Sequence, residues 1–301
     1  MASPLIVSLK KQKSFCGSKV KIFSPAKINL YLNVTGKYSN GLPAGKAGFH
    51  RLESIVERIS LKDEIEISVS ASPEVRISSS LKSLETQDNL AVKAALLIKK
   101  HCRIPYGLNI KLKKNIPVGS GLGGGSSNAA STLLALDALF DLGLSQKKFY
   151  HLGRTLGSDV NFFLSQSRFA FIWGRGEKVR PFEAKIRLKH HIIWPGKSIS
   201  TKEVYARLKP KLTKFFNSAN ILQNALKRKD SLLIKKGLFN ALEEGACAFC
   251  PELRKAKLYL AGRGIFAKVT GSGSALYTID TPLAFENNLP SSWKVFEAET
   301  F

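Results

Sequence analysis

Apolar and polar residues alternate in several short stretches of this chain, and a period of two predicts half-buried strands. The clearest example is Leu-Asn-Ile-Lys-Leu-Lys at 108–113, and residues 50–59 and 63–69 follow the same pattern. Residues 21–34 also predict strand, in two pieces, because Pro25 lacks the N–H that a strand ladder uses. The residues before them predict a short tail or an edge strand.

Helical spacing of apolar residues predicts helices over 127–140, 145–156 and 88–100, and Asp88 is the expected N-cap of the last. In the second half we expect a strand and four helices, at 190–194 and near 201–208, 218–227, 231–243 and 251–261. These elements make the chain α+β. Its 301 residues are enough for two domains, which we place at 1–170 and 171–301.

A glycine-rich segment between the strand at 108–113 and the helix at 127–140 is the most informative about function. From residue 117 to 127 it reads Pro-Val-Gly-Ser-Gly-Leu-Gly-Gly-Gly-Ser-Ser, with five glycines within seven positions. Glycine accepts positive φ and lets a ligand approach the backbone without a Cβ in the way. The helix start adds free N–H groups and the positive end of its dipole, so the segment predicts a phosphate-binding loop.

Other readings of this segment fit less well. A Walker A loop needs Lys directly after its last glycine, where Ser126 stands. Gly119, Gly121 and Gly124 match the dinucleotide fingerprint, but the preceding strand alternates, whereas a dinucleotide-binding strand is apolar throughout. The interpretation as a loop that has only a packing role fits least well, because ordering five glycines so close together costs much backbone entropy.

The net charge of +25, from 47 Lys and Arg against 22 Asp and Glu, raises the question of nucleic acid binding. The basic residues are dispersed and lack the interleaved aromatics of a single-strand platform. We therefore favour a generally basic surface that helps to attract anionic ligands. No run of eighteen apolar residues predicts a membrane span, and the first residues do not have the charge order of a signal peptide.

The cysteines do not predict a metal or disulfide site. Cys247 and Cys250 form a lone C-x-x-C pair, and no second pair of Cys or His lies nearby in the sequence to complete a zinc site. We interpret both as small helix-packing residues. Scattered cysteines favour a reduced, cytoplasmic protein.

Three motifs stand in order along the chain: Pro25-Ala26-Lys27-Ile28-Asn29, the loop 117–127 and Thr270-Gly271-Ser272-Gly273. Together they resemble the GHMP kinase superfamily, and the resemblance spans residues 21–280. It implies a two-domain fold, with an N-terminal domain like part of a ribosomal protein and a ferredoxin-like C-terminal domain.

Three further features resemble one branch of that superfamily: the triple glycine within 121–128, Asp88-Asn89-Leu90 and Leu156-Gly157-Ser158-Asp159-Val160. Members of this branch use ATP to phosphorylate a tertiary hydroxyl of a methylerythritol that carries a cytidine diphosphate group, in the non-mevalonate route to isoprenoids. The resemblance therefore implies ATP as phosphoryl donor and a small-molecule substrate with cytidine diphosphate. Mg²⁺ is expected with ATP, and beyond a guess at Ser127 the sequence identifies no protein ligand for it.

By the same resemblance Asp159 is the general base that takes the proton of the substrate hydroxyl. Lys27 is expected beside it, where a cation would keep the carboxylate ionised and stabilise the developing alkoxide. From the residues alone, a helix-end cap for Asp159 and an outward strand lysine for Lys27 stay open. The residues expected to bind the ATP phosphates through backbone N–H groups are Pro117, Val118, Gly119, Ser120, Gly121, Leu122, Gly123, Gly124, Gly125, Ser126 and Ser127.

The resemblance also implies a cytosine site, in which His50 hydrogen-bonds the base edge and Phe49 stacks on the base. We choose Tyr205 as the second aromatic, with core packing as the alternative for both rings. Asn29 is expected to bind the substrate polyol or to cap a loop, and Gly271 and Ser272 are expected to close over substrate or phosphate or to form a plain turn. The stretch 42–48 just before Phe49 resembles an insertion relative to the family pattern.

Two alternatives to this function stay open. Another GHMP kinase, acting on homoserine or mevalonate, would not need the aromatic and histidine pair for cytosine. A nucleic-acid-binding protein would need neither Asp159 nor the glycine loop, and its binding would fall steeply with salt. The sequence does not indicate an oligomeric state.

Overall fold

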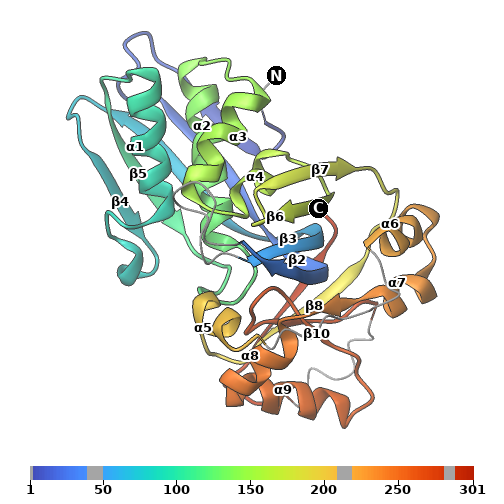
Figure 1. Ribbon diagram of the computed structural model, residues 1–301. Helices are drawn as coiled ribbons and strands as arrows, with labels where there is room; N and C mark the ends of the chain where they lie inside the picture. The colour runs from blue at the N-terminus through green and yellow to red at the C-terminus, as the bar shows by residue number, and fades with distance from the viewer. Residues whose placement is uncertain (1–2, 39–49, 209–218, 281–288) are drawn as a thin grey trace. The chain divides into compact units, whose positions relative to one another are not determined.

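The computed structural model describes residues 3–38, 50–208, 219–280 and 289–301 (Figure 1). The chain forms two compact units, each made of several segments. Unit 1 contains residues up to Ala26, then 62–116 and 123–166, whereas unit 2 contains 27–61, 117–122 and 167–301. The last segment of unit 2 thus begins close to the expected domain boundary after residue 170. Unit 2 also includes two stretches that lie in the expected N-terminal domain.

Unit 1 pairs a sheet with a layer of helices. Its strands are β1 (Ile6–Lys10), the first part of β2 (Lys19–Lys37), the second part of β3 (His50–Ser70), β4 (Val75–Ser79) and β5 (Gly107–Lys113). Strand β5 runs antiparallel to β3 and parallel to β4. Its apolar residues are buried and its lysines exposed, so the predicted alternation over 108–113 is confirmed.

The helices of unit 1 pack side by side over this sheet (Figure 1). They are the short η1 (Lys82–Leu84), α1 (Leu90–Cys102), α2 (Gly124–Phe140), α3 (Gln146–Leu156) and α4 (Val160–Leu164). Helix α2 touches the other three α-helices, and most of its residues are buried. This position explains why its residues are mostly small or apolar, and why several of its polar side chains are buried as well.

Unit 2 contains the rest of β2 and β3 and a second sheet. Strand β6 (Phe169–Gly174) pairs antiparallel with β3, and β7 (Lys178–Phe182) pairs antiparallel with β6. Strand β9 (Phe239–Asn240) pairs in parallel with β2. The second sheet has the order β10-β11-β8-β12, which are Lys268–Val269, Leu276–Tyr277, Lys189–Trp194 and Lys294–Glu299. The helices of this unit are α5 (Thr201–Ala206), α6 (Ala219–Arg228), α7 (Ser231–Gly237), α8 (Glu243–Phe249) and α9 (Pro251–Ala261).

Strand β2 is continuous from Lys19 to Lys37, so the predicted break at Pro25 is wrong. The N–H of Phe23 still donates to Leu5 beside β1, at 3.0 Å. Pro25 stands two residues further along β2, so its nitrogen faces the same side. Strand β1 runs antiparallel to β2 and begins at Ile6, opposite Ile22, so it does not extend as far as Pro25. The missing N–H of Pro25 therefore costs no hydrogen bond of the β1–β2 ladder.

Two other local predictions also need correction. The N-cap of α1 is Asn89, whose side chain accepts from the N–H of Ala91 at 2.9 Å, and the expected cap Asp88 pairs with Lys93 instead. The helix expected over 231–243 ends at Gly237, and β9 and α8 follow it. No helix in the described part of the chain is long and apolar enough to cross a bilayer.

Candidate functional site

The glycine loop makes very close contacts in unit 2. Gly121 has a φ of +80°, and a Cβ at this position would lie 2.2 Å from the carbonyl oxygen of Thr270. Gly119 has a φ of +64°, and a Cβ added there would lie only 2.6 Å from the Cβ of Ser198. Both glycines are therefore required by backbone conformation and by space, and the two glycine motifs of the sequence lie against each other.

Carbonyl groups hold the loop in place and leave its N–H groups available. The carbonyls of Gly119, Ser120 and Leu122 accept from the N–H groups of Ile199, Ala275 and Lys27, at 2.9, 3.0 and 3.0 Å. Within the residues that the structure describes, the N–H groups from Val118 to Leu122 donate to no other group. A run of backbone donors without acceptors suits an anion such as a phosphate group.

The start of helix α2, in unit 1, also has backbone N–H groups without intrahelical acceptors. It begins after Gly123, which has a φ of +71° and provides no side-chain cap. The N–H groups of the first helical turn, at Gly124, Gly125 and Ser126, therefore lack a partner inside the helix. Ser127 differs, because it is fully buried and its Oγ accepts from Ser24 Oγ at 2.9 Å. The hydroxyl of Ser127 is thus used inside unit 1, which makes it a poor magnesium ligand.

Lys27 is buried in unit 2, with only 4% of the residue exposed, so it is not an outward strand lysine. Its Nζ donates to Asn29 Oδ1 at 2.6 Å, and Asn29 Nδ2 donates in turn to Ser54 Oγ at 2.9 Å. Asn29 therefore orients the Lys27 ammonium group as the period of two in the strand predicts. One lone pair and one amide hydrogen of Asn29 are not used by these contacts and could meet a substrate hydroxyl.

Two residues outside the predicted site hold Asn29 in place. Its N–H donates to Thr270 Oγ1 at 3.0 Å, and its carbonyl accepts from the Tyr277 hydroxyl at 3.1 Å. Thr270 stands in the third sequence motif, which is a signal that could have identified it. Tyr277 lies on a short buried strand, and no local pattern points to it.

The segment 270–273 lies beside Lys27 within unit 2. Gly271 has a φ of +55°, and a Cβ there would lie 3.4 Å from both Lys27 Nζ and Asn29 Oδ1. Ser272 is buried, and its hydroxyl forms a 2.9 Å hydrogen bond with Thr201 Oγ1. The structure thus brings together Lys27, Asn29, Gly271 and the first part of the glycine loop, although Ser272 points its hydroxyl at α5.

His50 and Tyr205 meet in unit 2, at the start of β3 and near the end of α5, with ring centroids 4.9 Å apart. Burial and, to a smaller extent, the charge of Lys37 lower the pKa of His50 below 6.5, which keeps the imidazole neutral at pH 7. Its Nε2 is buried and has no hydrogen-bond partner among the described residues. Phe49 and the stretch 42–48 lie outside those residues.

Asp159 belongs to unit 1 and occupies the N-cap position of α4, but its carboxylate makes no cap hydrogen bond. The residue is half-buried. Gly157, two residues earlier, would place a Cβ 3.6 Å from Ser126 Oγ at the start of α2. The turn that carries Asp159 therefore lies close to the helix end of the glycine loop.

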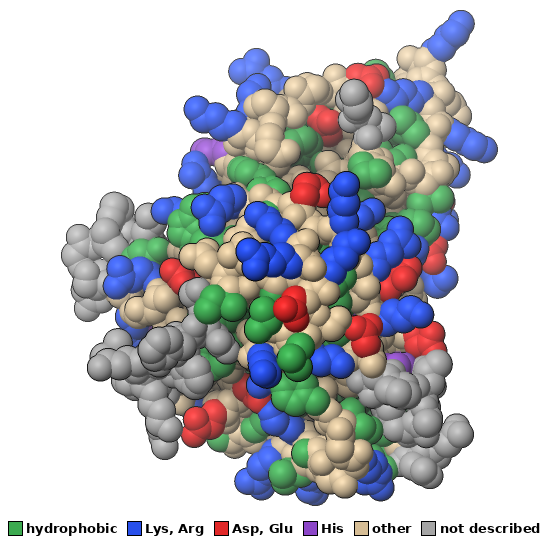
Figure 2. All heavy atoms as spheres, turned by 90° about the vertical axis from the view of Figure 1, so that its right-hand side faces the viewer, with side chains coloured by type: hydrophobic (Ala, Val, Ile, Leu, Met, Phe, Trp, Pro, Cys, Tyr) green, Lys and Arg blue, Asp and Glu red, His purple; other side chains and the backbone are tan. Residues whose placement is uncertain are grey.

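The remaining predictions concern cysteines, metal ligands and charge. Cys247 lies inside α8 and Cys250 precedes α9, and burial raises the pKa of both thiols, in line with a packing role. The described residues include no cluster of three or more His, Cys, Asp or Glu that could hold a metal ion. Lys and Arg side chains are spread over the face in Figure 2, with acidic side chains among them.

Comparison with known proteins decides the family. The family model of the GHMP kinases N terminal domain matches residues 89–167. A 4-diphosphocytidyl-2-C-methyl-D-erythritol kinase of Aliivibrio salmonicida (strain LFI1238) is 34% identical over 254 residues, which cover 84% of this chain and 81% of that protein. The chain belongs to the 4-diphosphocytidyl-2-C-methyl-D-erythritol kinase family. The resemblance found in the sequence motifs is thereby confirmed.

Further members of this kinase family support the assignment. The 4-diphosphocytidyl-2-C-methyl-D-erythritol kinase of Prochlorococcus marinus (strain AS9601) is 40% identical over 197 residues, 65% of this chain, and the chain spans 61% of that protein's length. A crystal structure of a 4-(cytidine 5'-diphospho)-2C-methyl-D-erythritol kinase matches with a TM-score of 0.76 and 29% identity, over 93% of this chain and 98% of that one. The predicted α+β fold of a GHMP kinase is confirmed.

Proposed function

We propose that this chain transfers the γ-phosphoryl group of ATP to the tertiary 2-hydroxyl of 4-diphosphocytidyl-2-C-methyl-D-erythritol. The observation that carries the phosphoryl-transfer assignment is the run of loop N–H groups without acceptors, from Val118 to Leu122. Phosphoryl transfer depends mostly on positioning and charge stabilisation, so a loop without reactive side chains is sufficient. The family of relatives with the same named activity supports the substrate.

In this proposal the loop 117–127 binds the ATP phosphates through backbone N–H groups and the first turn of α2. Mg²⁺ would neutralise phosphate charge, and it usually keeps several waters and takes only one or two protein ligands. The residues present suit such an ion held mainly by the phosphates, since Ser127 is committed to Ser24 and no metal cluster occurs among the described residues.

Asp159 is the proposed general base, and it accepts the proton that the substrate hydroxyl loses as its oxygen attacks the γ-phosphorus. A half-buried carboxylate on the turn beside the helix end of the glycine loop suits this role. Lys27 supplies a buried positive charge beside the glycine loop, where it stabilises negative charge that develops during transfer. Asn29 fixes the direction of that ammonium group.

His50 and Tyr205 are the proposed contacts of the cytosine ring, together with Phe49, whose position is not described. A neutral imidazole with an unused nitrogen can hydrogen-bond a base edge, and an adjacent phenol ring offers a stacking surface. This pair favours a cytidine substrate over the small alcohols homoserine and mevalonate. The free cysteines of the described chain are in keeping with the reducing cytoplasm.

ADP release with 4-diphosphocytidyl-2-C-methyl-D-erythritol tests the proposal. Wild type should turn over, and Asp159→Asn should lose at least ~10²-fold in kcat while ATP and CMP still bind. Asp141→Asn is the matched control, because this exposed acid at the C-terminal end of α2 pairs with Lys11 and should leave kcat unchanged. A wild-type protein that binds ATP without turning over this substrate would overturn the substrate assignment.

A further inference from the structure

A buried carboxylate in unit 1 contacts the chain on both sides of the glycine loop. We propose that Asp63 is a positioning residue for ATP, one that holds the two ends of the phosphate-binding loop together. The inference rests on the proposed role of this loop in binding ATP. Asp63 does not belong to any of the three sequence motifs.

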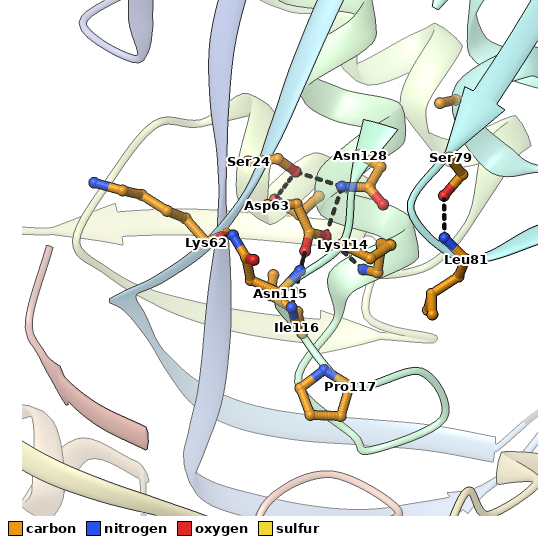
Figure 3. A network of polar contacts seen from close by, with 12 residues as sticks. Ser24, Lys62, Asp63, Ser79, Leu81, Lys114, Asn115, Ile116, Pro117 and Asn128 are labelled. Atoms are coloured by element: carbon orange, nitrogen blue, oxygen red, sulfur yellow. Dashed lines mark hydrogen bonds and ion pairs between the residues drawn. The ribbon is translucent and has the colours of Figure 1, made fainter. Parts of the chain in front are cut away.

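Asp63 accepts four hydrogen bonds, which use the lone-pair capacity of a carboxylate (Figure 3). Its Oδ1 accepts from the backbone N–H groups of Asn115 and Ile116, at 2.8 and 2.9 Å. Its Oδ2 accepts from Lys114 Nζ at 2.5 Å and from Asn128 Nδ2 at 2.9 Å. Three of the donors therefore precede the loop and one follows it.

The position of these donors limits how the loop can move. Ile116 is the residue immediately before Pro117, and Asn128 lies in the second turn of α2. Between them stand five glycines, whose backbone has more conformational freedom than that of any other residue. A fixed distance between the two ends removes much of that freedom before a ligand binds. Preorganised donors bind an anion more tightly because less ordering is needed on binding.

The network extends beyond Asp63 to the first turn of α2. Asn128 Nδ2 also donates to Ser24 Oγ at 2.8 Å, and Ser24 Oγ donates to Ser127 Oγ at 2.9 Å. A Cβ on Gly124 would lie 2.9 Å from Lys114 Nζ, so the ammonium group lies directly against the start of the helix. The start of α2 is thus held by hydrogen bonds to Ser24 of β2 and by close contact with Lys114, which follows β5.

A charged group is suited to this position despite its burial. The side chains of Asp63 and Lys114 are 0% and 4% exposed, and each charge is costly in the interior without the other. A neutral side chain at residue 63 could not accept all four hydrogen bonds. Loss of the carboxylate should therefore release Lys114, Asn115 and Asn128 together, and the loop with them.

The test compares binding of ATP and of CMP to the same full-length samples by titration calorimetry. Asp63→Asn should raise the Kd for ATP about tenfold, since misplaced donors bind phosphate less well, and leave the Kd for CMP within about twofold. CMP reports on His50 and Tyr205 of unit 2, so a general loss of folding would weaken both ligands. Asn128→Ala should raise the Kd for ATP about threefold, since it removes one of the four hydrogen bonds and keeps the charge pair. If Asp63→Asn does not fold, Asn128→Ala tests the proposal in its place.

Two control variants match the chemistry of the change. Glu57→Gln neutralises another fully buried carboxylate, which contacts His190 and Thr300 in unit 2, and should leave the Kd for ATP unchanged. Asn115→Ala keeps the backbone N–H that donates to Asp63 and removes only the exposed side-chain bond to the carbonyl of Lys62. It should also bind ATP as wild type does.

The outcomes separate this inference from the proposed function. If wild type does not bind ATP, the proposed function fails. If wild type binds ATP and folded Asp63→Asn and Asn128→Ala bind it within about twofold of wild type, the positioning role of Asp63 is overturned and the kinase assignment stands. The role would also be overturned if Asp63→Asn weakened the binding of ATP and of CMP equally. The same holds if Glu57→Gln weakened ATP binding as much as Asp63→Asn does.

Discussion

The imidazole of His50 lies against the ring of Tyr205, with centroids 4.9 Å apart and ring planes inclined by 31°. The two residues come from distant parts of the sequence, on β3 and α5. Because burial lowers the pKa of His50, the ring stays neutral at pH 7 and can act as both donor and acceptor. This pair is the described part of the proposed cytosine site.

Tyr205→Ala should weaken CMP binding by about tenfold, because stacking on an aromatic ring contributes roughly 1–3 kcal/mol per base. The Kd for ATP should not change. Tyr205→Phe keeps the ring and should bind CMP within about twofold of wild type. Calorimetric titration of the three proteins measures the effect, and an unchanged CMP affinity in Tyr205→Ala would leave Tyr205 as a packing residue only.

Lys27→Met should reduce kcat by about 10²-fold with little change in the KM for the alcohol, because the buried cation acts on charge that develops during transfer. Methionine has similar length, so packing around residue 27 should change little. Steady-state kinetics with ATP and the cytidine substrate measures the effect. The control is Lys21→Met in unit 1, where the side chain pairs with Glu64 at 2.7 Å and should not affect kcat. A rise in KM at constant kcat would contradict the role of Lys27.

Gly121→Ala should weaken ATP binding by at least about tenfold. The new Cβ would require a left-handed φ, which costs roughly 1–2 kcal/mol, and it would also lie 2.2 Å from the Thr270 carbonyl. Gly143→Ala is the matched control, since Gly143 has a φ of +60° and its Cβ would meet nothing within 4 Å. Both variants should lose stability through backbone strain, and only Gly121→Ala should lose affinity for ATP.

The buried pair of Glu57 and His190 in unit 2 predicts a stability that falls as the pH rises above 6.5. Burial opposes the charged imidazolium, but the charge and hydrogen bond of Glu57, the Thr278 carbonyl and the charge of Asp280 together raise the pKa of His190 above 6.5. The two ring nitrogens face acceptors, at 3.1 Å to Glu57 Oε1 and 3.0 Å to the Thr278 carbonyl. The folded state therefore favours the protonated ring.

Because the folded pKa is raised, this stabilisation is fully present below pH 6.5, the unfolded value, and is lost as the pH rises through the folded pKa. Urea unfolding should show the free energy of unfolding falling above pH 6.5, by at most about 1.4 kcal/mol per pH unit from this group. Glu57→Gln removes the charge that raises the pKa and should flatten this part of the curve. An unchanged slope in Glu57→Gln would contradict the prediction.

Several features of this protein follow from local sequence alone. The alternation at 108–113 predicted β5, because a strand with one buried face repeats every two residues. The glycines from Gly119 to Gly125 indicated a phosphate loop, since their backbone freedom depends on residue type and not on distant contacts. The order of three short motifs was enough to indicate the family.

Other features depend on residues that are far apart in the chain. Pro25 fits within β2 because β1 does not extend to the position beside it. Helix α7 ends before Phe239 because the next residues form β9, which pairs with Tyr31 and Leu32 of β2. Asn240 reinforces that geometry by donating to the carbonyls of Val269 and Gly271. A local pattern contains no information about such partners.

The site shows the same division. The sequence determined the residue types of the loop and the spacing of Lys27 and Asn29 on one strand face, because both depend only on local backbone geometry. Only the tertiary structure decided that Lys27 is buried, that His50 meets Tyr205 and that Asp63 holds both ends of the loop. Burial and hydrogen bonds between distant residues arise when the whole chain packs, so no short stretch of sequence specifies them.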